Sequence, residues 1–460
     1  MNQKEHSEPQ MVRAVSRWEL VGLAFNDVIG SGIYLLPAAA AALLGVLSIG
    51  AIIIAGIAVG LLVLCFAEAS SYFDEAGGGY LYTREAFGDF IGFEVGWMTW
   101  IARVASVAAL SAGFALAFGF IWPAAAEVWH VGSVHFLGMQ FDLTLPSWER
   151  TLVIVGLLIL LAWVNVVGVK PGARVAVALT IAKSVPLLLF IGIGFFFIDW
   201  NSLGGMQLPE ISTLGEASLL LLFAYAGFEN TPAAAGEYKN PQRDVPFALI
   251  EMIICVTLMY ALVQLVAVGT FPGLAESSQP LTDSALVFLG GFGAVLMGIG
   301  AIISIGGNAG NTTLIGPRYL FALSKDGYGP KKMGDIHPDY KTPAAAIITQ
   351  TALALVLALS GSFVQLAMLS IIARMSTYVG TAVAVPFLRR RFGDQPNSIQ
   401  LPGGYAIPIA ALIICAVLLA STTTANLIAG AIALLAGAVI YYFRREETEG
   451  KSEVAGYNLL

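Results

Sequence analysis

The sequence has few charged residues: Asp, Glu, Lys and Arg make up 12% of its 460 residues. A soluble domain usually carries about 25% charged residues. Hydrophobic residues make up 57% of the chain, and the mean hydropathy is +0.80. The apolar residues form runs long enough for a helix to span a bilayer, which takes about 20 residues. The composition therefore excludes a soluble protein and predicts an all-α integral membrane protein.

Cysteine and histidine are also scarce, with three and four residues respectively. Each cysteine lies alone within an apolar run, so neither a disulfide framework nor a metal-ligand spacing is predicted. The apolar runs contain no clustered nucleophile and base, and the chain has no glycine-rich phosphate-binding loop. We therefore expect neither an enzyme nor an ATP-driven pump, and we expect no cofactor, no metal ion and no nucleic-acid partner.

Twelve apolar runs are predicted to cross the membrane. They cover residues 19–44, 48–67, 90–122, 150–168, 174–199, 217–236, 246–271, 285–315, 344–360, 364–387, 404–420 and 424–443. This threading places 19 of the 23 Lys and Arg residues on one side and Arg150 alone on the other, while Arg103, Lys183 and Arg374 fall inside spans. Basic residues collect on the cytoplasmic side. We therefore expect a multi-pass protein of the cytoplasmic (inner) membrane with both termini in the cytoplasm.

Two spans, five apart, are interrupted by glycine or proline, at residues 26–34 and 223–232. Close helix packing would explain either cluster alone. Two broken helices at matching positions of two five-span halves instead indicate a transporter built from inverted repeats, with its substrate between them. This division gives a cytoplasmic tail (1–18), a first repeat (19–199), a second repeat (217–387), two further spans (404–443) and a cytoplasmic tail (444–460).

Four motifs then identify a family. Residues 29–33, 68–82 and 318–343, together with 223–229 and the following 237–246, resemble motifs of the amino acid–polyamine–organocation (APC) superfamily, in the same order. Gly79 departs from the family pattern, in which proline is commoner. The resemblance implies a leucine-transporter-like fold of ten core helices plus two, which works by alternating access.

The resemblance also implies where a substrate binds. The α-carboxylate of an amino acid would meet the N–H groups and hydroxyl around Gly30, Ser31 and Gly32, and a helix N-terminus suits an anion. The α-amine would meet carbonyls near Val28 and residues 223–226. Phe223 matches an aromatic residue that gates the substrate in arginine/agmatine exchangers. The predicted substrate site comprises Asp27, Val28, Ile29, Gly30, Ser31, Gly32, Arg103, Phe223, Ala224, Ala226, Gly227 and Glu229.

Two ionisable residues inside the spans are candidates for proton coupling, because a charge at mid-membrane is costly. Lys183 lies in the fifth span, where proton-coupled relatives carry a lysine in place of a sodium site. Burial disfavours a charged amine, which can then lose and regain its proton in each cycle. The alternative is that Lys183 stays charged and has only a structural role, bound to carbonyl groups of the first span. Glu229 matches a carboxylate that is common in the family. It either joins the proton path or contacts the substrate, or it is a structural acceptor that bridges the broken helices.

Asp27 and Arg103 depart from the commonest family pattern, and their roles stay open. They either pair with each other, or Arg103 recognises an acidic or polar side chain, or Asp27 binds a second amine. Four polar residues of the eighth span either face the site or Lys183 or cross-link helices: Asn308, Asn311, Thr312 and Thr313. Arg374 is expected to be structural or part of a cytoplasmic gate.

The sequence therefore predicts a secondary transporter of amino acids, proton-coupled and working by alternating access. The alternatives are an amino acid or amino acid/polyamine exchanger without net proton coupling and, more distantly, a nutrient sensor that does not transport. The expected partners are an amino acid, protons and the lipid bilayer. The choice between monomer and homodimer stays open, as does the identity of the amino acid or amine.

Overall fold

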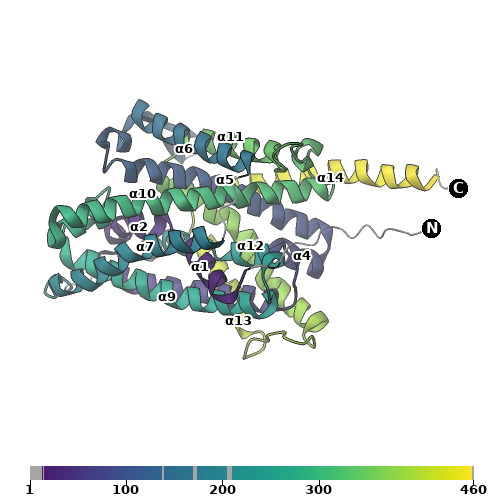
Figure 1. Cartoon of the computed structure of the whole chain (residues 1–460), viewed down its shortest axis with the longest axis horizontal. Coiled ribbons are helices and arrows are strands. Elements are labelled where there is room, and N and C mark those ends of the chain that lie inside the picture. The colour runs from purple at the N-terminus through teal and green to yellow at the C-terminus, as the bar shows by residue number, and fades with distance from the viewer. Residues whose placement is uncertain (1–12, 14, 137–138, 169–172, 205–209, 458–460) are drawn as a thin grey trace.

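The computed structural model describes residues 13, 15–136, 139–168, 173–204 and 210–457. Most of the predicted N-terminal tail, including Lys4, lies outside the described residues, as does Lys170. The described chain forms a bundle of long helices that run side by side along one axis (Figure 1).

The first half of the chain begins with a helix in two parts, α1 (Arg17–Val28) and α2 (Ser31–Leu44). The helices that follow are α3 (Ser48–Ser71), α4 (Gly78–Phe87), α5 (Asp89–Phe118), α6 (Trp148–Val167) and α7 (Ala173–Gly194). Short 3₁₀ turns occupy η1 (Gly45–Leu47), η2 (Pro123–Ala126) and η3 (Phe195–Phe197).

The second half begins with another helix in two parts, α8 (Ile211–Tyr225) and the 3₁₀ segment η4 (Phe228–Glu237). The remaining helices are α9 (Pro241–Thr270), α10 (Pro280–Lys325), α11 (Ala344–Ser360), α12 (Phe363–Phe392), α13 (Ala406–Ala420) and α14 (Thr424–Tyr457). Two more 3₁₀ turns are η5 (Leu274–Glu276) and η6 (Lys331–Gly334).

The helices are apolar enough to form a multi-pass membrane protein. Within the described residues, eight helical segments are long and apolar enough to cross a bilayer, and α11 and α13 are shorter apolar helices. Large apolar side chains also remain exposed on the outside of the bundle, including Ile54, Phe196, Val356 and Leu435. A soluble protein would bury most such groups, whereas lipid tails solvate them.

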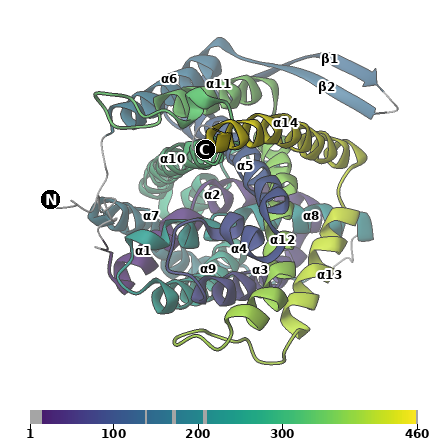
Figure 2. The same cartoon turned by 90° about the vertical axis from the view of Figure 1, so that its right-hand side faces the viewer.

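One hairpin interrupts the helical pattern. β1 (Val128–Phe136) pairs antiparallel with β2 (Met139–Pro146), between α5 and α6. Figure 2 shows the hairpin at the edge of the bundle, beside α6 and α11. A search for apolar runs of spanning length does not detect strands this short, so the sequence analysis did not anticipate the hairpin.

Several helices extend beyond the apolar runs that predicted them. α14 continues to Tyr457, so it includes most of the predicted C-terminal tail, and it projects beyond the rest of the bundle (Figure 1). α10 covers the predicted eighth span and further residues at both ends, with a left-handed kink at Gly290. Hydropathy detects the part of a helix that contacts lipid, whereas a helix can continue into water.

The breaks in the two divided helices lie in the interior of the bundle. α1 packs on α7 and α9, and α2 packs on α8 and α10. α5 runs along α10 and α12. This packing brings the α1–α2 break and the α8–η4 break together, facing α5, α10 and α12.

Candidate substrate-binding site

The first helix breaks at Ile29 and Gly30. Ile29 has an extended backbone, and Gly30 precedes α2 with φ −137° and ψ −135°. A helix end leaves main-chain groups without partners inside the helix. The break therefore presents carbonyls from the end of α1 and N–H groups from the start of α2 at one place in the interior.

The second helix breaks at Ala226 and Gly227. Gly227 has φ +128°, in the left-handed region that favours glycine. A Cβ at Gly227 would also collide with the main-chain oxygen of Asp27, and a Cβ at Gly32 would lie 2.6 Å from the Cα of Ala224. Glycine at these two positions lets the two breaks approach each other closely.

Lys183 of α7 binds the carbonyl side of the first break. Its amine donates to the carbonyl oxygens of Asn26 at 3.0 Å and Ile29 at 2.9 Å, and its side chain is fully buried. Asn308 of α10 donates a hydrogen bond to another main-chain carbonyl near the end of α1, that of Asp27, at 3.1 Å. Lys183 thus contacts the first break directly and does not line the pocket described below.

Tyr260 of α9 connects the two breaks. Its hydroxyl lies 3.2 Å from the carbonyl oxygen of Val28 and 3.2 Å from that of Ala224. These are carbonyls of the kind expected to bind a substrate amine. A carbonyl oxygen has two lone pairs, so this contact leaves each able to accept another hydrogen bond.

Glu229 is the centre of a buried charge cluster. Its Oε1 accepts a hydrogen bond from Arg103 Nη2 at 3.1 Å and pairs with Arg374. Its Oε2 accepts from the Gly227 N–H at 3.0 Å and from the Tyr378 hydroxyl at 3.5 Å. Arg103 and Glu229 are 1% and 2% exposed, so this buried cluster joins α5, η4 and α12.

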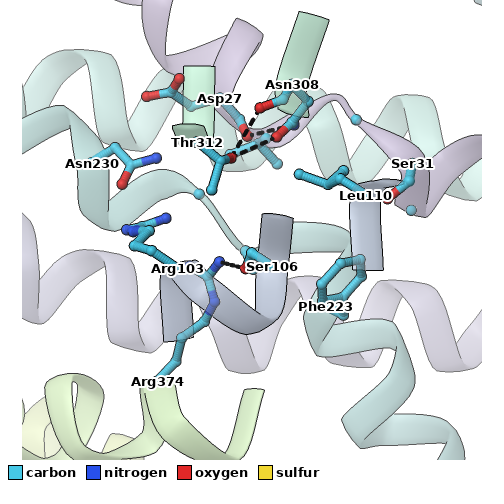
Figure 3. Close-up of a pocket in the computed structure, with 15 residues that line it drawn as sticks. Asp27, Ser31, Arg103, Ser106, Leu110, Phe223, Asn230, Asn308, Thr312 and Arg374 are labelled. Carbon is cyan, nitrogen blue, oxygen red and sulfur yellow. Dashed lines mark hydrogen bonds between the residues drawn. The ribbon is translucent and has the colours of Figure 1, made fainter. Parts of the chain in front are cut away.

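Asp27 does not pair with Arg103. Its carboxylate accepts a hydrogen bond from Asn311 of α10 and lies beside the Asn230 amide. Figure 3 shows Asn230 between Asp27 and Arg103. The Arg103 guanidinium pairs instead with Glu229. The expected alternative of an Asp27–Arg103 ion pair is therefore replaced by the Arg103–Glu229 pair.

A polar pocket lies between the two breaks and the three helices that face them (Figure 3). Its lining residues are Asp27, Val28, Gly30, Ser31, Gly32, Arg103, Ser106, Leu110, Phe223, Ala226, Gly227, Asn230, Asn308, Thr312 and Arg374. Four of their polar atoms are buried without a hydrogen-bond partner, and one of these, Arg374 Nη1, is held in the ion pair with Glu229. The other three are Ser31 Oγ, Arg103 Nε and Asn230 Oδ1. Buried polar groups are nearly always paired, so these atoms are available to a ligand.

Nine of the twelve residues predicted for the substrate site line this pocket, and three do not. The three are Ile29, whose carbonyl binds Lys183, Ala224, whose carbonyl accepts from Tyr260, and Glu229, which lies behind Arg103 and Arg374. Of the open polar candidates, Asn308 and Thr312 line the pocket. Arg374, which was expected to be structural or part of a gate, lines the pocket and also pairs with Glu229.

Sequence reasoning missed Ser106, Leu110 and Asn230. Ser106 and Leu110 follow Arg103 by three and seven residues, a spacing that places all three on one face of α5. Asn230 directly follows Glu229 in the second break. A search along these two segments, starting from the predicted arginine and glutamate, would have found all three.

Comparison with known proteins gives a consistent result over nearly the whole chain. A family model described as amino acid permease matches residues 15–449. The branched-chain amino acid permease BcaP of Bacillus subtilis (strain 168) is 28% identical over 90% of this chain and 88% of its own length. The serine/threonine exchanger SteT of the same organism is 29% identical over 85% and 86%, and its methylthioribose transporter is 27% identical over 88% and 87%.

Proposed function

Because this chain belongs to the amino acid permease family, we propose that it carries amino acids across the cytoplasmic membrane by alternating access and couples their uptake to protons. The observation that supports this most directly is the pocket bounded by both helix breaks. Main-chain groups released at such breaks bind the charged ends of small substrates in transporters of this architecture.

In this proposal the amino acid binds between the two breaks. Its α-carboxylate meets the start of α2, where Gly30 and Gly32 line the pocket and the buried Ser31 hydroxyl has no hydrogen-bond partner. The first N–H groups of a helix have no partner within the helix. Anions bind favourably at helix N-termini. Its α-amine meets the carbonyls of Val28 and Ala226 at the opposite helix ends, and Phe223 covers the pocket from the α8 side.

Lys183 provides the coupling to protons. The protonated amine holds the Asn26 and Ile29 carbonyls, and loss of its proton removes the charge that orders this end of α1. A charged lysine with no ion pair is costly in a buried setting, which makes proton release accessible. Glu229 is the second candidate for the proton path, because it links the Gly227 N–H to two helices that face the pocket.

The coupling is tested with purified protein in liposomes, by measuring uptake of labelled amino acids with and without an inward proton gradient and without sodium. Lys183→Gln is the informative variant, because its amide can still donate to the two carbonyls but cannot titrate. We expect Lys183→Gln to transport independently of the gradient and Lys183→Ala to be less stable as well. If uptake by Lys183→Gln still depends on the gradient, Lys183 has only a structural role.

Exchange is the second candidate mechanism, because one relative is named as a serine/threonine exchanger. The same liposomes decide between the two mechanisms when they are loaded with or without unlabelled substrate. Symport predicts accumulation into empty liposomes when the gradient is present. Exchange predicts uptake only into loaded liposomes, whether or not the gradient is present.

The proposal includes a membrane arrangement in which both termini are cytoplasmic and residues 19–199 and 217–387 form two inverted repeats. The distribution of Lys and Arg in the sequence supports this orientation. In a background with the three cysteines replaced, Ser202→Cys should react with an impermeant maleimide added to intact cells. Lys331→Cys should react only after the membrane is opened. If Lys331→Cys reacts in intact cells and Ser202→Cys does not, the protein has the opposite orientation in the membrane.

A further inference from the structure

We propose that the amino acid carried in this pocket has an anionic side chain, whose carboxylate binds Arg103 while Arg374 supplies the second positive charge. This inference rests on the proposed transport of amino acids, and it narrows the substrate to the acidic class. The names of the relatives do not decide the class, because they range over branched-chain, hydroxylated, cationic and acidic amino acids and a thio-sugar.

The charge balance of the site is the first argument. Arg103 and Arg374 share one carboxylate, that of Glu229. Arginine stays protonated in proteins, so this cluster has one positive charge in excess. The nearest other ionisable residues are Asp27, which lines the pocket, and Lys183, which binds the first break. Their formal charges are opposite, so together they do not remove the excess. An uncompensated buried charge is unfavourable, and an anionic ligand would neutralise it.

The unused hydrogen-bond donors are the second argument. Arg374 donates through Nη2 to Ser106 at 2.6 Å and through Nε to Ser370 at 3.2 Å, in addition to its contact with Glu229. Arg103 contacts Glu229 through Nη2 and has Tyr319 beside its guanidinium, but its buried Nε has no partner. A guanidinium with a free N–H group is the side chain best suited to a carboxylate.

The position of the arginines is the third argument. Arg103 and Arg374 line the same pocket as Ser31, and Figure 3 shows them across the pocket from it. An amino acid whose α-carboxylate meets the start of α2 therefore directs its side chain toward the arginine cluster. A neutral side chain would leave the excess charge in place, and a cationic one would be repelled.

The test compares side chains of the same shape that differ in charge. Wild-type protein in liposomes is given labelled glutamate, aspartate, glutamine, asparagine, leucine or lysine in separate assays. Unlabelled glutamate and aspartate then serve as competitors for each neutral or cationic substrate. We expect the acidic amino acids to be preferred over their amides by roughly 10- to 100-fold in kcat/KM, the range of a charge-assisted hydrogen bond.

Arg103→Gln then tests whether Arg103 is the residue that recognises the side-chain carboxylate. This variant leaves Glu229 paired with Arg374 alone, so the cluster becomes neutral and the protein should fold, which its melting temperature in detergent will verify. We expect Arg103→Gln to lose the preference for acids over amides, and Arg103→Lys to retain part of it. Arg391→Gln is the matched control, because Arg391 lies on α12 like Arg374 but its side chain is 62% exposed.

The outcomes separate the two proposals. Preference for acids in the wild type and its loss in Arg103→Gln support the inference. Transport of neutral or cationic amino acids with no competition by glutamate or aspartate overturns the inference. A preference for acids that persists in Arg103→Gln overturns it as well. In both cases the proposed transport of amino acids still stands. Absence of transport for every class of amino acid, in protein that melts cooperatively, overturns the proposed function and this inference with it.

Discussion

The two helix breaks are held by side chains of opposite charge. At the first break, the amine of Lys183 binds carbonyl groups at the end of α1. At the second, the carboxylate of Glu229 accepts a hydrogen bond from the N–H of Gly227 at the start of η4. Each charge complements the local helix dipole, since a cation is favourable at a helix C-terminus and an anion at an N-terminus.

The two arrangements differ in what surrounds the charged group. Within the described part of the chain, Lys183 forms no ion pair, whereas Glu229 is paired with two arginines. A buried cation without a counter-ion is unfavourable, whereas two guanidinium groups stabilise the carboxylate between them through charge-assisted hydrogen bonds. In the proposals above, the first break accordingly carries the proton coupling, and the charge cluster at the second break selects the substrate.

Glu229→Gln should have the largest effect on stability. The substitution leaves Arg103 and Arg374 buried without a carboxylate, and breaking a buried ion pair in this way costs about 3–5 kcal/mol. We expect a much lower melting temperature in detergent than for Arg103→Gln, in which the remaining arginine keeps its partner. Equal melting temperatures for the two variants would show that the cluster is not held together by charge.

Gly227→Ala tests whether the close approach of the two breaks is needed for transport. Alanine in the left-handed region costs roughly 1–2 kcal/mol, and its Cβ would also collide with the Asp27 carbonyl. We expect uptake into liposomes to fall at least tenfold, in line with that energy.

The matched control for Gly227→Ala is Gly290→Ala. Gly290 also has a positive φ, +61°, but a Cβ there would meet nothing within 4 Å. The Gly290→Ala variant should therefore have a strained backbone but transport as well as the wild type. If both variants lose uptake equally, left-handed strain alone accounts for the effect and the approach of the breaks is not critical.

Tyr260→Phe should have the smallest effect, and it tests the link between the breaks. Loss of one hydroxyl hydrogen bond costs about 0.5–1.5 kcal/mol. Tyr225→Phe is the control, because the Tyr225 hydroxyl is also buried and donates to a main-chain carbonyl, that of Ile52, at 2.9 Å. We expect similar melting temperatures but reduced uptake only for Tyr260→Phe. Reduced uptake in both variants would mean that Tyr260 has no special role in joining the breaks.

Much of the helical organisation follows from the sequence. Long apolar runs are found as helices because a lipid-facing backbone must satisfy its hydrogen bonds within the helix. Glycines at 30 and 227 mark the positions where the first and sixth apolar segments are interrupted. The predicted inverted repeat, the orientation in the membrane and the roles of the site residues remain predictions, to be decided by the experiments above.

The partners of the buried charges were decided by the tertiary structure alone. Sequence places Asp27, Arg103, Glu229 and Arg374 in different apolar segments, but it does not give the rotation of each helix about its axis. Side-chain packing between helices fixes that rotation. It directs Arg103 to Glu229, more than 120 residues away, and brings Arg374 to the same carboxylate. Hydropathy determines which segments enter the membrane, whereas packing determines which of their few charges meet.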